Sequence, residues 1–182
     1  MKTESAFMYV LRLAGTLLLI TVIVAAILAG VNAVTAPEIQ RLAEEKTQRA
    51  IEAVLPGGGS PVEFTDGTGL VLECYKGEAG YAVKVAPAGF NGAVTMMVGV
   101  DFEGNVLGIS VINHSETAGL GAVAAADTSA GETFREQFFG MSGSLSVTKD
   151  GGTVEAITGA TVTSRAVCQG VNAALDCAAN MG

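Results

Sequence analysis

The feature that most constrains this chain is an uncharged apolar run near its beginning. Residues 13–36 contain no Asp, Glu, Lys or Arg, and Asn32 is their only strongly polar side chain. About 20 apolar residues in a helix suffice to cross the roughly 30 Å hydrocarbon core of a bilayer. The alternative is a cleaved signal peptide, whose apolar region is usually shorter, roughly 7–15 residues. We therefore expect residues 13–34 to form a transmembrane helix.

Basic residues beside the run predict its orientation. Lys2 and Arg12 precede the run, and the positive-inside rule then places residues 1–12 in the cytoplasm. Three further basic residues follow the run within its next 15 positions, so the asymmetry is small. We expect a single-pass protein of the cell (inner) membrane, with everything after the helix outside the cytoplasm.

Residues 35–59 are predicted to form an amphipathic stalk helix and a Pro/Gly linker. Thr35 can cap such a helix, Pro37 suits its first turn, and Glu38 occupies the capping-box position. Apolar residues then recur near helical spacing. The sequence PGGG at 56–59 ends the pattern.

Residues 60–182 are expected to form one extracytoplasmic domain, in which strands precede a helix. Apolar, β-branched runs between Gly-containing turns predict an antiparallel meander, with strands at residues 70–75, 81–87, 94–100 and 106–113. Weaker patterns predict a short helix at 133–139 and two short strands at 147–149 and 154–157. From Thr163 onward, small apolar residues recur at helical spacing and would let a helix lie close against the sheet. This order indicates an α+β domain.

Charge and cysteine usage exclude several kinds of function. The chain has 10 Lys and Arg against 18 Asp and Glu, a net charge of −8, and no basic cluster. Nucleic-acid binding is not expected, because phosphate contacts need Lys and Arg. Cys74, Cys168 and Cys177 show no CxxC and no Cys/His spacing, so we expect no metal site in this chain. They are predicted to be small core residues, with a redox pair as the unsupported alternative.

The segment ITGATVTSR, at residues 157–165, joins a predicted strand to a predicted helix. Gly159 allows close approach of a ligand to the backbone, and Thr161 and Thr163 place hydroxyls at the helix start. A helix N-terminus offers unpaired N–H groups and a positive dipole end to an anion. These features are compatible with a phosphate site. Simple N-capping by Thr161 or Thr163 is the plainer interpretation.

A second segment, HSETAGLG at residues 114–121, follows a predicted strand. It contains the only histidine of the chain, a carboxylate, two hydroxyls and two glycines. Glycine-rich loops after strands often close around ligands. His114 has no accompanying Cys or Ser nucleophile arrangement, so a structural histidine is the simpler interpretation.

These two segments resemble the hallmarks of a known family. The residues Thr158-Gly159-Ala160-Thr161, followed by Val-Thr-Ser, resemble the flavinylation motif of FMN-binding domains. Such domains occur in the G subunit of Rnf complexes and in the C subunit of sodium-translocating NADH:quinone reductases. The segment HSETAGLG resembles the second hallmark, which usually has Pro where Ala118 stands. The sequence GFNG at 89–92 is similar to the family's Gly-aromatic-x-Gly turn, and the resemblance extends over the whole chain.

The resemblance implies a covalent cofactor at one threonine. In this family the last Thr of the motif, here Thr161, carries FMN in phosphoester linkage. Residues implied beside it as cofactor-binding are Thr158, Gly159, Ala160, Thr163, His114, Glu116, Thr117, Gly119, Leu120 and Gly121. No catalytic residue is implied. Because few Lys or Arg residues are available in the acidic domain, we expect the covalent bond and backbone N–H groups to hold the phosphate.

The resemblance also implies a function and partners. The chain would be the G-type electron-transfer subunit of an Rnf-type ferredoxin:NAD⁺ oxidoreductase, a translocase, without complete activity alone. Its partners would be other membrane and iron–sulfur subunits and a flavin transferase that uses FAD and Mg²⁺, since no base is expected beside Thr161. The alternatives are a C-type quinone-reductase subunit, a standalone flavinylated extracytoplasmic carrier, and a non-redox membrane-anchored assembly module.

Overall fold

The computed structural model describes residues 2–181, with side chains from Phe7 onward, and the chain divides into two compact units between Glu45 and Lys46. The first helix, α1 (Lys2–Val54), contributes to both units. In the first unit its apolar side chains from Phe7 to Leu42 are exposed. By length and composition this helix can cross a membrane, as the uncharged run predicts.

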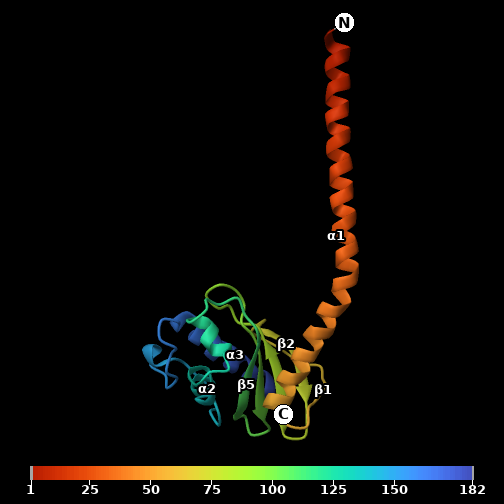
Figure 1. Cartoon of the computed structure of the whole chain (residues 1–182). Coiled ribbons are helices and arrows are strands. Elements are labelled where there is room, and N and C mark those ends of the chain that lie inside the picture. Colours follow the sequence, from red (N-terminus) through yellow and green to blue (C-terminus); the bar gives the residue numbers. More distant parts are fainter. Residues whose placement is uncertain (1, 182) are drawn as a thin grey trace. The chain divides into compact units, whose positions relative to one another are not determined.

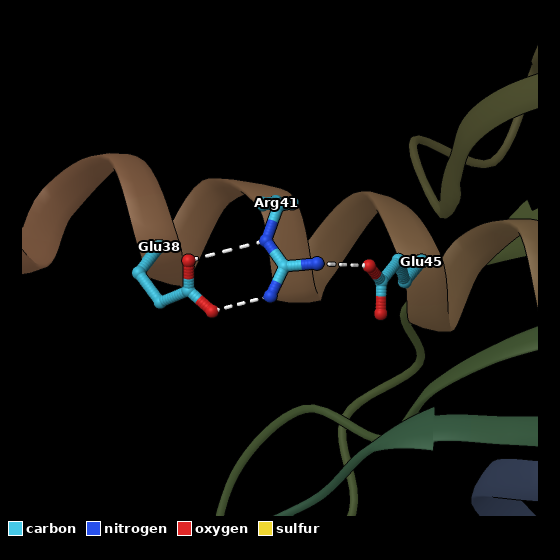
Figure 2. Close-up of polar contacts among 3 residues, drawn as sticks. All are labelled: Glu38, Arg41 and Glu45. Atoms are coloured by element: carbon cyan, nitrogen blue, oxygen red, sulfur yellow. Dashed lines mark hydrogen bonds and ion pairs between the residues drawn. The ribbon is translucent and has the colours of Figure 1, made fainter.

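The expected new helix start at Thr35 is wrong, because α1 continues through Pro37 without interruption. Proline removes one backbone hydrogen bond from a helix, but its own φ is helical, and the long helical segments on both sides keep the chain in register. Just after Pro37, Arg41 pairs with Glu38 and Glu45 one turn away in each direction (Figure 2). Such i,i+3 and i,i+4 pairs support a helix.

The second unit contains a five-stranded antiparallel sheet in which each strand pairs with its neighbours in the sequence. The meander is therefore confirmed, and the short first strand is the one that the sequence pattern did not predict. The strands are β1 (Ser60–Pro61), β2 (Val71–Lys76), β3 (Gly80–Val85), β4 (Thr95–Asp101) and β5 (Val106–Asn113).

One face of the sheet is covered by the last two turns of α1. Ile51, Val54 and their neighbours pack against Ala82 of β3 and Met97 of β4. Gly99 lets the helix come close, because a Cβ at this position would overlap the carbonyl oxygen of Val54. The end of the predicted stalk helix is thus part of the domain core.

The opposite face is covered by α3 (Thr161–Ala179), which packs on β3 and β4, while α2 (Ser129–Glu136) lies against β5. Figure 1 shows both helices, in teal and blue, on one side of the green strands. The predicted small-residue helix face is confirmed at Gly170, where a Cβ would overlap Met96 and crowd Pro87. The α+β architecture is therefore confirmed.

The two short strands expected at residues 147–149 and 154–157 do not form. Only one parallel bridge, Val147 with Val154, is present there, and residues Thr148–Asp150 form a 3₁₀ turn, η2. Gly151, with a φ of +85°, reverses the chain after the three residues of η2. The segments on either side are therefore too short to pair as two strands. A second 3₁₀ turn, η1 (Gly121–Ala125), follows the loop after β5.

Candidate functional site

A cavity of about 290 Å³ lies at the N-terminus of α3. Four segments form its walls: the start of α3, the loop after β5, the turn between β3 and β4, and η2. The lining residues are Phe90, Glu116, Thr117, Leu120, Gly121, Lys149, Gly159, Ala160, Thr161, Val162 and Thr163. The two segments that the sequence singles out, 157–165 and 114–121, therefore meet in space.

The first turn of α3 leaves its backbone donors without acceptors. Thr161 is the first helical residue, and the earliest helical hydrogen bond runs from Ser164 N to Ala160 O at 3.0 Å. Within residues 2–181, the N–H groups of Thr161, Val162 and Thr163 therefore have no acceptor. Unpaired N–H groups at the positive end of a 19-residue helix form an anion-binding surface.

Capping by Thr161 or Thr163, the plainer interpretation of this segment, is wrong. The N-cap residue is Ala160, and no side-chain cap is present. Thr163 Oγ1 instead donates to Glu116 Oε2 at 2.6 Å in a buried contact. The Thr161 side chain is half-buried and faces the cavity. The side chains of both threonines therefore form part of the cavity wall.

The turn before α3 is fixed by a buried serine and a left-handed glycine. Ser164 Oγ accepts from Ile157 N and donates to Ala160 O, both at 3.0 Å. Gly159 has a φ of +78°, and a Cβ there would lie 2.9 Å from Leu120 Cδ2. Glycine is required here for its backbone angle, whereas the exposed Leu120 side chain could move away from a Cβ.

A lysine that no sequence pattern indicates lies beside Thr161. Lys149 Nζ is 3.1 Å from Thr161 Oγ1, and Lys149 is held next to α3 by the ion pair of its neighbour Asp150 with Arg165. The sequence predicts that the covalent bond and backbone N–H groups hold a phosphate here, and it does not indicate this lysine. The position of Lys149 depends on the turn η2 and on a pair of residues 15 positions apart, which no local motif displays.

Glu116 joins three walls of the cavity. Its Oε1 accepts from Phe90 N at 2.8 Å and from Asn91 N at 3.1 Å, and its Oε2 accepts from Thr163 Oγ1. Burial by itself disfavours the charged carboxylate and raises its pKa. The hydrogen bonds from Thr163, Asn91 and Phe90, together with the nearby His114, outweigh burial, so the net pKa of Glu116 is lowered.

Eight of the eleven predicted cofactor-binding residues line the cavity: Thr161, Gly159, Ala160, Thr163, Glu116, Thr117, Leu120 and Gly121. The other three lie outside it. Thr158 and Gly119 border a separate surface depression. His114 Nδ1 accepts a hydrogen bond from Glu116 N at 3.2 Å within the same loop.

Three exposed apolar side chains complete the cavity wall, namely Phe90, Leu120 and Val162, which are 68%, 43% and 45% exposed. Of these three, only Leu120 is among the residues predicted to bind the cofactor, although the sequence also places Phe90 in the GFNG turn. The signal for Phe90 is its place in a tight Gly-containing turn, where an exposed aromatic ring has no core to join. Val162 lies one residue after Thr161 on the outer face of α3, a placement that requires the helix start to be known.

Comparison with known proteins shows which family contains this chain. The FMN-binding domain family matches residues 89–176, the part of the chain that contains the whole cavity. The G subunit of the Na⁺-translocating ferredoxin:NAD⁺ oxidoreductase complex of Acetobacterium woodii is 32% identical, over 99% of this chain and 97% of that protein. The G subunit of an ion-translocating oxidoreductase complex of Methanosarcina acetivorans is 33% identical, over 88% and 90%. The chain belongs to the G-subunit family of ion-translocating oxidoreductase complexes.

The residues of this G-family chain suit both the phosphate and the ring system of FMN. The unpaired N–H groups of α3 and the ammonium of Lys149 suit a phosphate. The exposed apolar side chains of Phe90, Leu120 and Val162 suit the face of a flat aromatic ring system. The polar and apolar groups lie at one cavity, so a single ligand with both characters can contact them together.

Proposed function

We propose that this protein carries FMN in phosphoester linkage to Thr161 and transfers electrons within an Rnf-type ion-translocating ferredoxin:NAD⁺ oxidoreductase. The observation that carries the proposal is the position of the Thr161 hydroxyl. It lies at the first residue of α3, faces the cavity, and is bordered by unpaired N–H groups and by Lys149. A phosphate bonded to this oxygen would lie in the anion-binding surface of the helix. When bound, FMN would supply the redox chemistry, and the chain would supply position and electrostatics.

Attachment requires a second protein under this proposal. Within the described residues Thr161 Oγ1 hydrogen-bonds to Lys149 Nζ alone, and no carboxylate or imidazole is bonded to it. A threonine hydroxyl is a weak nucleophile without an adjacent base. A flavin transferase with FAD as donor and Mg²⁺ would therefore perform the transfer, and the G-type chain would be its substrate.

The proposed transmembrane helix implies where the rest of the chain would lie and which roles would belong to other subunits. Residues 13–34 would span the cell membrane with residues 1–12 in the cytoplasm, residues 35–59 would lead away from it, and the FMN-binding domain in 60–182 would be extracytoplasmic. One spanning helix without an internal charge does not form an ion pathway. Ion translocation would therefore reside in other membrane subunits, and iron–sulfur subunits would exchange electrons with the flavin.

The test is the intact mass of the full-length chain after coexpression with a flavin transferase. Wild type is expected to gain the mass of one FMN minus water, and Thr161→Ala is expected to gain nothing. Thr153→Ala is the matched control, because it removes an exposed threonine hydroxyl outside both the motif and the cavity. An FMN adduct on Thr161→Ala, or none on wild type, would refute the attachment site. Copurification of the wild-type chain with other flavin and iron–sulfur subunits tests the assignment to a complex.

A further inference from the structure

Lys149 contacts the oxygen that the proposed function assigns to the flavin. An ammonium group has three donors and no acceptor, so in the 3.1 Å contact Lys149 Nζ donates to Thr161 Oγ1. The proton of the Thr161 hydroxyl must then point away from the lysine. The Thr161 hydroxyl oxygen therefore has the positive charge of Lys149 on one side. Its own proton lies on the other side, from which it can leave.

The backbone of Lys149 is held in place by hydrogen bonds and by an ion pair of its neighbour. Thr148 N donates to Val154 O at 2.8 Å, which closes the loop that contains η2. Asp150 accepts two hydrogen bonds from the guanidinium of Arg165 on α3, at 2.6 and 2.7 Å. Two-pronged pairs of this kind fix orientation as well as distance. Lys149 therefore sits on a turn that is tied to the helix whose N-terminus it faces.

The carboxylates near the cavity are hydrogen-bonded to groups other than Lys149. Asp150 is engaged by Arg165, and Glu116 accepts three hydrogen bonds from other groups. Among the described residues Lys149 forms no ion pair. Its ammonium group adds one positive charge to the positive end of α3, while the Glu116 carboxylate in the same cavity is directed to Phe90, Asn91 and Thr163.

We propose that Lys149 is the positioning residue that holds the FMN phosphate against Thr161 while the phosphoester forms. This inference rests on the proposed function. In the transfer step, a bond forms between Thr161 Oγ and the FMN phosphorus of FAD, and the bond from that phosphorus to the bridging oxygen of the diphosphate breaks. AMP leaves with the bonding electron pair, and the hydroxyl proton passes to a base of the transferase or to water. Throughout this transfer step, the ammonium group of Lys149 binds a non-bridging oxygen of the phosphoryl group. It neither gains nor loses a proton.

The experiment measures the initial rate of FMN attachment to the full-length chain in detergent, with purified flavin transferase, FAD and Mg²⁺, by intact mass. Lys149→Met keeps the length of the side chain and removes the charge. We expect about a fivefold lower rate, since a charge-assisted hydrogen bond at an exposed position is worth less than a buried one. Lys149→Arg should restore most of the rate. Lys76→Met, an exposed lysine in β2 outside the cavity, is the matched control and should react like wild type.

Salt gives a readout that a purely structural role would not produce. The ratio of the wild-type rate to the Lys149→Met rate should fall toward one as NaCl rises, because mobile ions screen an exposed charge. Unchanged thermal melting of Lys149→Met would exclude a folding effect.

The possible outcomes separate the two proposals. If wild type gains no FMN, the proposed function fails and this inference fails with it. If wild type reacts and Lys149→Met reacts as fast as Lys76→Met, only the role of Lys149 is refuted. Equally slow Lys149→Met and Lys149→Arg variants would also overturn it, because charge would then not be the cause. A slow Lys149→Met with rescue by Lys149→Arg supports it.

Discussion

Removal of the Glu116 carboxylate should loosen three walls of the cavity at once. Glu116 is 9% exposed and accepts hydrogen bonds from Phe90 N, Asn91 N and the buried hydroxyl of Thr163. Each such bond contributes about 1 kcal/mol net, so Glu116→Ala should lower the free energy of unfolding by about 3 kcal/mol. For a domain of this size, that corresponds to a fall in melting temperature of roughly 10 °C.

The matched control is Glu78→Ala, which removes an exposed carboxylate in the turn between β2 and β3. Its melting temperature should stay close to that of wild type, because isolated surface substitutions change stability little. Both variants are compared by thermal unfolding of the detergent-solubilised chain. If Glu116→Ala melts within about 2 °C of Glu78→Ala, the three hydrogen bonds do not stabilise the domain.

The charge of Glu116 adds a dependence on pH. Because the pKa of folded Glu116 lies below its ordinary value of 4.5, the charged form contributes stability that is complete above this value. That contribution is lost as the pH falls through the lowered pKa. Glu116→Gln keeps an acceptor for Phe90 N and Asn91 N but cannot titrate. The difference in stability between wild type and Glu116→Gln should therefore shrink on acidification below pH 4.5, and a difference independent of pH would contradict the assignment.

Two further predictions concern the helix start and the cysteines. Gly159→Ala and Gly143→Ala both place Ala at a left-handed φ, +78° and +76°, and each should cost about 1–2 kcal/mol. Only Gly159 lines the cavity, two residues before Thr161, so Gly159→Ala alone should slow FMN attachment in the mass assay, and equal rates for the two variants would refute a role of this turn in placing Thr161. Burial raises the pKa of Cys74 to about 12 and of Cys168 to about 11. The thiols of the folded chain should therefore resist maleimide at about pH 8 and react in denaturant, and adducts on the native protein would contradict their burial.

The sheet could be predicted from the sequence because its signals are local. Each of the four long strands is bounded by a turn rich in Gly, Asp or Asn, and adjacent strands in the chain are adjacent in the sheet. The helix start at Thr35 failed for the opposite reason. The local cap pattern there is real, but a helix already in progress from the membrane segment continues through Pro37 and overrides it.

The cavity could be predicted only in part. The segments of Thr161 and Glu116 carry recognisable patterns, yet the role of Glu116 does not follow from them. Its partners are the backbone of Phe90 and the side chain of Thr163, 26 and 47 residues away. Lys149 depends likewise on a bridge and an ion pair formed only in the folded domain. Contacts of this kind are decided by tertiary packing, which a single sequence does not display.

The polar and apolar groups of the cavity differ in their exposure, and this difference accounts for a covalent linkage under the proposed function. The polar end is built on α3, where Ser164 and Gly159 fix the backbone around Thr161. The apolar side chains that line the cavity, Phe90, Leu120 and Val162, are all exposed. At about 290 Å³ the cavity lies at the lower limit of ligand sites, roughly 300–1,000 Å³, which usually enclose most of a ligand. A flavin held here by its phosphate alone would bury little of its ring and would dissociate readily. A bond at Thr161 removes that dissociation and leaves the ring at the surface, where another protein of the complex can exchange electrons with it.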